Sequence, residues 1–124
     1  MINGINSREM ILEILLEIEE GEHSHVAIRN ALSKYQFLPK QDRAFITRVC
    51  EGTLEYRIQI DYIINSFSKV TVDKMKPAIR EILRSAVYQL KYMDSVPDSA
   101  VCNEAVKLAQ RKGFYNLKPF VNGV

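Results

Sequence analysis

The sequence predicts an all-α domain of about six helices. Apolar residues recur at intervals of three and four along most of the chain, which is the spacing of one face of a helix. Prolines and glycines divide these stretches, and no stretch alternates apolar and polar residues around a tight turn as a β-hairpin does. The chain has 124 residues, of which 47% are hydrophobic and 26% charged. We therefore expect a single domain over residues 1–124, with its own apolar core.

The first helix is expected over about residues 7–19. Asn6 and Glu9 have the spacing of a reciprocal N-terminal cap, in which each side chain satisfies a backbone N–H of the first turn. Gly21 follows, and glycine readily adopts the left-handed conformation that ends a helix. The apolar face of this helix consists of Met10, Ile11, Ile14, Leu15 and Ile18.

A short second helix is expected after Ser24, which is placed to cap it, and should end before Pro39 because the residue preceding a proline disfavours helix. Residues 41–66 have the most regular periodicity and predict one helix of about 26 residues and about 39 Å. Gly52 lies in its middle, where glycine costs up to about 1 kcal/mol relative to alanine. We expect a close helix crossing or a kink at Gly52.

Prolines begin two further helices, because a proline at the first helical position leaves no N–H unpaired. One starts at Pro77, and the next starts at Pro97 and ends at Gly113. The apolar face of the latter is rich in alanine, which lets another helix approach closely, so we expect it near the centre of the bundle. A sixth helix begins near Leu117 and is cut off by the end of the chain. This predicts that the natural polypeptide continues.

Charge is unevenly distributed along the chain, although the formal net charge is only +2. Residues 1–22 carry one arginine and six glutamates, a net charge of −5, which leaves +7 for residues 23–124. This segregation indicates one acidic face and a larger basic face, as in proteins that meet a polyanion on one side. A solvated surface of ordinary mixed charge is the alternative.

No residue pattern in the chain indicates catalysis. The five glycines are isolated, which excludes a glycine-rich phosphate-binding loop. His23 and His25 flank Ser24 at an expected helix start, without an acidic or cysteine residue at metal-ligand spacing. Cys50 and Cys102 are far apart, and we expect both to be reduced and buried. We therefore expect no catalytic residue, no metal site and no cofactor in this domain.

Features of membrane and secreted proteins are also missing from the sequence. No window of about eighteen apolar residues exists, so no membrane-spanning helix is expected. The N-terminus has neither the basic flank nor the unbroken apolar stretch of a secretory signal. We expect a cytoplasmic protein without a membrane partner.

Basic residues cluster on the later helices. Four of them share one face of the helix that begins at Pro77 and would form a cationic ridge able to neutralise successive phosphates. These four are Lys76, Arg80, Arg84 and Lys91. A second group lies at the end of the next helix and beyond it, where cations also stabilise the helix dipole, and consists of Lys107, Arg111, Lys112 and Lys118. We interpret both groups as candidate RNA-binding residues.

Aromatic residues near these cations have two interpretations. Their faces suit stacking on unpaired bases, whereas aromatic residues at helical spacing more often belong to a core. The residues concerned are Tyr88, Tyr92, Phe114, Tyr115 and Phe120. Both interpretations remain open from the sequence.

Charged residues of the 41–66 stretch favour structural roles. Asp42 stands where a carboxylate meets a helix N-terminus and its dipole. Arg43 and Asp61 fall off the apolar stripe. We expect Arg43 to pair with another acid and hold helices together, with RNA contact as the alternative.

Several segments resemble the NusB-like domain. They are Lys-Gln-Asp-Arg-Ala-Phe-Ile at 40–46, Glu-Gly-Thr-Leu at 51–54 with Ile60, Asp61, Tyr62, Ile63 and Ile64 following, Ile-Leu-Arg-Ser-Ala-Val-Tyr-Gln-Leu at 82–90, Val-Pro-Asp-Ser-Ala-Val-Cys-Asn-Glu-Ala-Val at 96–106, and Phe-Val-Asn-Gly-Val at 120–124. The segments at 42–45 and 51–54 narrow the resemblance to the N-terminal domain of the Sun/Fmu family, the ribosomal RNA small-subunit methyltransferase B proteins. Asn-Glu-Ala at 103–105 and Phe-Val-Asn-Gly-Val at 120–124 are shared with free-standing NusB proteins.

This resemblance implies a helical RNA-binding domain of two packed three-helix bundles. It also implies a following domain, absent here, that uses S-adenosylmethionine and a catalytic cysteine to methylate C5 of a cytosine in small-subunit rRNA. Neither Cys50 nor Cys102 matches the motifs of that domain. Lys118, Phe120 and Asn122 match a region that NusB proteins use near RNA. The acidic start of this chain departs from the basic N-terminal arm of NusB, which favours RNA contact through later helices.

The sequence is compatible with three functional hypotheses. The first is an RNA-binding domain that orients rRNA for its own C-terminal methyltransferase domain. The second is a NusB-type antitermination factor that binds RNA together with a ribosomal protein. The third is a packing module for its own catalytic domain, without RNA contact. Self-association of the fragment through its cut-off last helix, and the nucleotide recognised, stay open.

Overall fold

The computed structural model describes residues 7–111, which form six α-helices, one short 3₁₀ helix and no strand. The helices are α1 (Ser7–Glu19), α2 (Ser24–Lys34), α3 (Lys40–Glu55), α4 (Arg57–Phe67), the 3₁₀ helix η2 (Val72–Lys74), α5 (Pro77–Tyr92) and α6 (Asp98–Arg111). The predicted all-α class is confirmed. Asn6, Gly113 and the helix expected from Leu117 lie outside the described residues.

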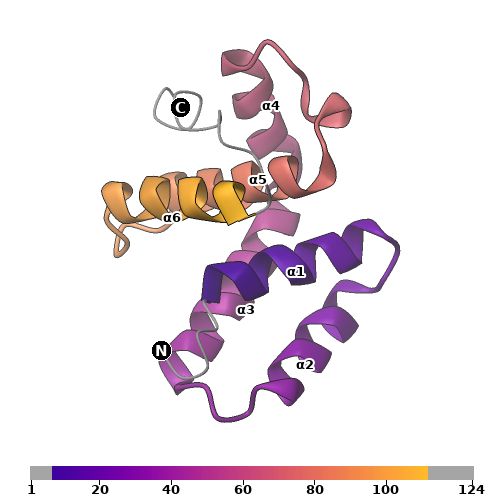
Figure 1. Cartoon of the computed structure of the whole chain (residues 1–124), viewed down its shortest axis with the longest axis vertical. Coiled ribbons are helices and arrows are strands. Elements are labelled where there is room, and N and C mark those ends of the chain that lie inside the picture. Colours follow the sequence, from indigo (N-terminus) through magenta and orange to yellow (C-terminus); the bar gives the residue numbers. More distant parts are fainter. Residues whose placement is uncertain (1–6, 112–124) are drawn as a thin grey trace.

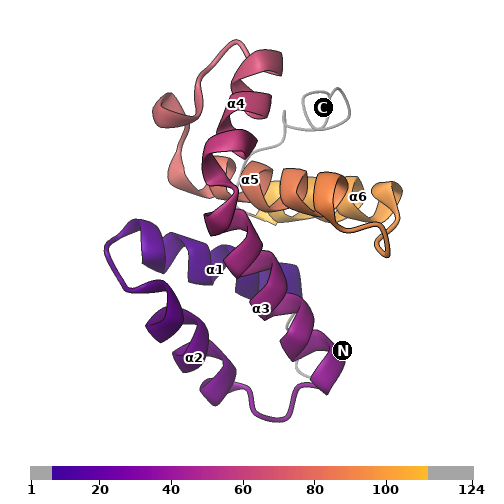
Figure 2. The same ribbon diagram turned by 180° about the vertical axis from the view of Figure 1, so that it is seen from behind.

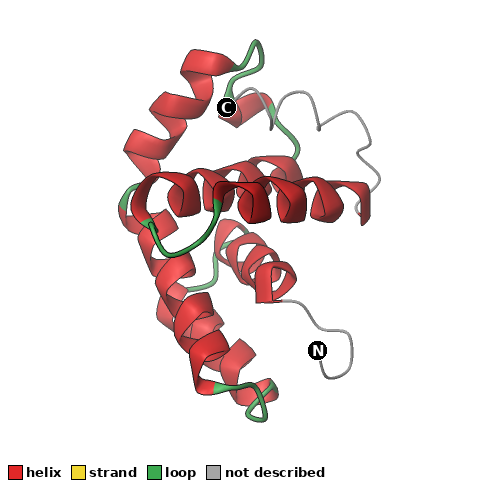
Figure 3. Cartoon of the chain, turned by 90° about the vertical axis from the view of Figure 1, so that its left-hand side faces the viewer, coloured by secondary structure: helices red, strands yellow, loops and turns green. Residues whose placement is uncertain are grey.

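The helices form two groups joined by the α3–α4 connection. α1, α2 and α3 pack together in one group, and α4, α5 and α6 in the other (Figures 1 and 2). α5 packs against α1, α3, α4 and α6, and the α5–α6 pair crosses between α4 and the N-terminal helices (Figure 3). The expectation that the alanine-rich helix, here α6, lies at the centre is therefore wrong. α5 holds that place because its buried face is wider, running from Glu81 to Gln89.

One apolar core runs through both groups. Its fully buried large side chains come from α1, α3, α4, α5 and α6, and include Ile11, Leu12, Ile14, Leu15, Ile46, Val49, Ile60, Ile64, Ile82 and Val101. Burial of this apolar surface is the main favourable contribution to folding. The functional surfaces described below therefore lie on a single packed unit.

The limits of the first two helices follow local chemistry. α1 ends as predicted, since Gly21 has a φ of 116° and its N–H donates to the Ile18 carbonyl at 3.0 Å. Ser24 is the first residue of α2 rather than its cap. The cap position is taken by His23, whose side chain makes no capping hydrogen bond, so this detail of the prediction is wrong.

The single helix expected over residues 41–66 is in fact two. It breaks at Tyr56, which has φ −101° and ψ 19° and separates α3 from α4. The predicted close crossing at Gly52 is confirmed, because a Cβ atom there would overlap the Tyr88 ring of α5. The break falls four residues later, where the Tyr56 ring stacks on Tyr92 with centroids 4.5 Å apart. Helical periodicity continues across the break, which is why the sequence does not reveal it.

Both cysteines are unpaired, and they differ in burial. Cys50 of α3 is fully buried, as expected, and burial is the main cause that raises the pKa of its thiol. Cys102 of α6 is only partly buried, so the expectation that it is buried is wrong. Within residues 7–111, no helix has the length and apolar character needed to cross a bilayer.

Candidate nucleic-acid interface

The cationic ridge expected on α5 does not form, because two of its members are held by carboxylates. Arg84 Nε and Nη2 donate to the two oxygens of Asp61 at 2.8 and 2.9 Å, and Arg84 Nη1 donates to Glu81 Oε2 at 2.7 Å. Arg80 pairs with Glu19 of α1, and its Nη1 donates to the Met75 carbonyl at 3.1 Å.

The Arg84 side chain is only 11% exposed. Desolvation would lower its pKa, but the hydrogen bond to Asp61 and the charge of Glu81 raise it above the usual value. A guanidinium that already uses three donors on protein carboxylates has little left for a phosphate. Arg80 and Arg84 therefore hold helices together, and they do not offer unneutralised charge to a polyanion.

The other predicted residues have different surroundings. Lys76 and Lys91 are exposed at the two ends of α5. Lys107 lies 3.5 Å from Glu104, and Arg111 Nη1 donates to Glu9 of α1 at 3.0 Å. The two cations of these pairs are well exposed, so they remain open to exchange with a polyanion. Lys112, Lys118, Phe120 and Asn122 lie outside the described residues.

Aromatic residues form a stacked group at the α3–α4 junction. The tyrosine cluster consists of Tyr56, Tyr88 and Tyr92, with ring centroids 4.5 to 6.4 Å apart. Tyr88 is 6% exposed, so its ring belongs to the core. Tyr92 is partly buried against the core, and its hydroxyl is within 2.6 Å of Gln59 Oε1. Phe114, Tyr115 and Phe120 are outside the described residues.

Arg43 has the structural role that the sequence suggested, with different partners. Its Nη1 donates to the carbonyl oxygens of Leu32 at 2.9 Å and Tyr35 at 3.2 Å. These carbonyls belong to the C-terminal end of α2, where helices leave acceptors unsatisfied. The expected pairing with an acid is therefore wrong, although Arg43 does join two helices. Asp42 lies in the first turn of α3.

Exposed cations gather instead beside a groove of about 560 Å³ along α3, which we call the α3 groove. It is lined by Leu32, Lys40, Arg43, Ala44, Thr47, Arg48, Glu51, Gly52, Glu55 and Tyr88. Arg48 Nη2 donates to the Tyr92 carbonyl at 3.3 Å, and Lys91 Nζ lies 5.9 Å from the centroid of the Tyr92 ring. Lys91, a predicted residue, and Arg48 thus both contact Tyr92.

Lys40 and Arg48 were not predicted as RNA-binding residues, because the clusters of basic residues in the sequence lie on later helices. Their separation of two helical turns on α3 was the available signal, since residues eight apart share a face. Glu51 and Glu55 line the C-terminal half of the same groove. A polyanion is consequently favoured against Lys40, Arg48 and Lys91 and disfavoured next to the two glutamates.

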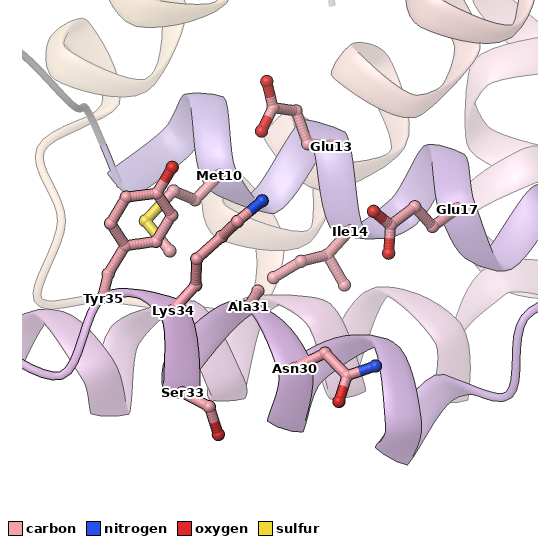
Figure 4. Close-up of a pocket in the computed structure, with 9 residues that line it drawn as sticks. All are labelled: Met10, Glu13, Ile14, Glu17, Asn30, Ala31, Ser33, Lys34 and Tyr35. Carbon is pink, nitrogen blue, oxygen red and sulfur yellow. The ribbon is translucent and has the colours of Figure 1, made fainter.

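A second hollow lies between α1 and α2 and is acidic on one side. It has a volume of about 470 Å³. Figure 4 shows residues of both helices that line it, among them Glu13 and Glu17 on α1 and Asn30 and Lys34 on α2. Because Glu13 and Glu17 are exposed, this face repels a polyanion. The acidic face predicted from residues 1–22 is thus located on α1, away from the cations of the α3 groove.

Comparison with known proteins identifies relatives in two groups. The chain is 32% identical over 117 residues to a probable ribosomal RNA small subunit methyltransferase B of Bacillus subtilis (strain 168), covering 94% of this chain and 26% of that protein. It is 34% identical to the corresponding protein of Synechocystis, and the match covers 97% of this chain and 27% of that protein. The chain therefore spans about a quarter of the length of these relatives. It is also 34% identical to the transcription antitermination protein NusB of Bacillus velezensis, and this match covers 95% of this chain and 88% of that protein.

Solved structures with the same fold include antitermination factors. The structure of T. maritima NusB matches with a TM-score of 0.80 at 25% identity, covering 96% of this chain and 87% of that one. A structure of antitermination factors NusB and NusE in complex with dsRNA matches with a TM-score of 0.83 at 19% identity. This match covers 94% of this chain and 88% of the matched chain. The model of the NusB family matches residues 5–124. The chain belongs to the NusB family.

Proposed function

We propose that this chain is an RNA-binding domain that orients small-subunit rRNA for a methyltransferase domain of the same polypeptide. The observation that carries the proposal is the match to methyltransferase B proteins over nearly the whole of this chain and only a quarter of theirs. In those relatives the remaining three quarters have room for a catalytic domain. The reaction proposed for the parent protein is methylation of cytosine C5.

Within such a protein, this domain would position RNA and leave the chemistry to the rest of the chain. Phosphate contacts fix the register of a nucleic acid without reading its sequence. Lys40, Arg48 and Lys91 are the exposed cations that Tyr92 and α3 bring together, so we assign the RNA contact to them. Lys107 and Arg111 on α6 remain further candidates.

S-adenosylmethionine is proposed only for the catalytic domain. The described residues offer no glycine-rich loop, because their two glycines are far apart. Gly21 follows the end of α1, and Gly52 lies within α3 against the Tyr88 ring. The partners proposed for this domain are therefore rRNA and its own methyltransferase domain.

Direct titration of RNA tests the proposal. A labelled small-subunit rRNA fragment is titrated with the protein at two ionic strengths, for the unaltered chain and for Arg48→Gln. Each lost phosphate contact on single-stranded RNA should reduce the slope of log affinity against log salt by about 0.7. Arg29→Gln on α2, an exposed arginine outside the α3 groove, is the matched control and should leave the slope unchanged.

Two other outcomes would select the alternatives. Similarity to NusB over 88% of its length favours an antitermination role as the second candidate. RNA binding that appears only when NusE is added would support that role. Absence of RNA binding at every ionic strength would leave a module that packs against its own catalytic domain. Equal slopes for Arg48→Gln and the unaltered protein would remove the α3 groove from the interface.

A further inference from the structure

A small polar pocket lies where α1, α3, α4 and α5 meet, apart from the α3 groove. Its volume is about 150 Å³. The aliphatic part of its wall comes from Leu15, Ile18 and Leu54. The polar part comes from Glu19, Thr53, Arg57, Glu81 and Arg84. Such a combination of an apolar wall and a few convergent polar groups is typical of a small-molecule site.

Two polar atoms of this wall have unmet hydrogen-bonding capacity. Glu19 Oε2 and Thr53 Oγ1 are buried and have no hydrogen-bond partner among the described residues. Thr53 is 1% exposed, so bulk water does not reach its hydroxyl. Buried polar atoms are nearly always hydrogen-bonded in folded proteins. A carboxylate oxygen can only accept, which means that Glu19 Oε2 requires a donor.

The unpartnered carboxylate oxygen of Glu19 favours a charged donor, because a charge-assisted hydrogen bond is stronger than a neutral one. Three carboxylates, those of Glu19, Asp61 and Glu81, share the guanidinium groups of Arg80 and Arg84. Arg84 divides its donors between Asp61 and Glu81. Desolvation by burial raises the pKa of Glu81 above the usual value in spite of the nearby Arg84.

We propose that this pocket binds a primary alkylammonium, the cationic end of a small aliphatic amine. An ammonium group has three donors and no acceptor, which suits the acceptors Glu19 Oε2, Thr53 Oγ1 and the Glu81 carboxylate. The alkyl stem would lie against Leu15 and Ile18. The site is independent of the proposed RNA contact.

Arg57 distinguishes this proposal from anion binding. It lines the pocket and is exposed at the start of α4. Its charge opposes an incoming ammonium, so Arg57→Gln should strengthen amine binding. If the pocket took an anion instead, the same substitution would weaken binding.

The test is titration of the full chain with n-butylammonium chloride, followed through amide NMR shifts. The expected result is saturable shifts at the amides of Thr53 and Leu54, with no such shifts for butan-1-ol, which has a similar shape and no charge. Thr53→Val keeps the side-chain shape and removes the hydroxyl, so it should weaken binding about fivefold, as for the loss of one hydrogen bond. Thr47→Val on the same helix is the matched control and should bind normally.

Three results would overturn the proposal. One is equal binding of butan-1-ol, which would mean that the pocket is only an apolar void. Another is unchanged affinity in Thr53→Val. The third is the absence of saturable shifts at Thr53 and Leu54 at millimolar amine, which would mean that water satisfies the two atoms. Glu19→Gln adds a second variant, because its loss of charge should weaken binding even if Thr53→Val proves unstable.

Discussion

At the scale of single residues, Gly52 is the position where the fold depends most directly on the absence of a side chain. The Tyr88 ring fills the space that a Cβ atom would occupy, and this ring is buried and stacked on Tyr92 with centroids 5.4 Å apart. The ring cannot move aside without disturbing this contact and the core around it. Gly52 is therefore a packing requirement of the α3–α5 crossing.

Gly52→Ala should lower the free energy of unfolding by about 1–2 kcal/mol. Overpacking of a core costs about 1–3 kcal/mol, and the higher helix propensity of alanine offsets up to about 1 kcal/mol of this. Urea denaturation of the variant measures the loss. In a Tyr88→Leu background the same substitution should cost much less, since the ring is gone. An equal loss in both backgrounds would show that Tyr88 is not the cause.

Arg84 provides a second residue-scale prediction, because its guanidinium fork matches two carboxylates. Lysine has one ammonium and cannot reproduce the paired hydrogen bonds to Asp61 together with the bond to Glu81. Arg84→Lys should therefore cost about 2 kcal/mol of stability, measured by denaturant unfolding. It should leave the salt slope of RNA binding unchanged. A reduced slope with unaltered stability would return Arg84 to the RNA interface.

The sequence could have revealed only one of these partners, Glu81, which lies three residues before Arg84 on α5. Helical spacing correctly places Arg80 and Arg84 on one face of α5, but Glu19 and Asp61 come from 61 and 23 residues earlier in the chain. Such distances are closed only by the tertiary fold. Lys91 remained exposed because it lies in the last turn of α5, past the carboxylates of α1 and α4. Burial and pairing, rather than residue type, separate structural cations from available ones.

At the scale of elements, the positions of glycines and prolines were sufficient to predict several helix limits. α1 begins at Ser7 and ends before Gly21, and α5 begins at Pro77, all as predicted. The break at Tyr56 was not predicted because it depends on ring stacking with Tyr92 of α5. Local chemistry therefore determines where these helices begin and end, whereas contacts between helices determine where a periodic stretch breaks.

The α2–α3 connection gives a prediction at this scale. Arg43 of α3 donates to the Leu32 carbonyl, which would otherwise be an orphan acceptor at the end of α2, and to the Tyr35 carbonyl, which also accepts from the Leu38 N–H. Arg43→Ala should raise hydrogen exchange of amides in α2 and lower the melting temperature by several degrees, as expected for about 1–2 kcal/mol. Arg29→Ala, on the exposed side of α2, should alter neither. Unchanged exchange in Arg43→Ala would mean that packing alone holds α2.

At the scale of the whole molecule, α5 makes the two helix groups one structural unit. It packs against α1 and α3 on one side and against α4 and α6 on the other. Arg80 adds a polar link across the same interface, since it pairs with Glu19 at the end of α1. The acidic hollow of α1–α2 and the cations near α3 are thereby held in fixed relation, which allows a polyanion to be attracted at one surface and repelled at another.

Unfolding should accordingly be a single cooperative transition. The tyrosine cluster reports the α3–α4–α5 junction through near-UV circular dichroism, and far-UV circular dichroism reports all helices, so the two thermal transitions should coincide. Arg80→Gln weakens the link between α1 and α5 and should lower both midpoints together. If the groups were independent, Arg80→Gln would split the curves, with the α1–α3 helices melting before the tyrosine signal changes. Separate midpoints in the unaltered protein would contradict the continuous core.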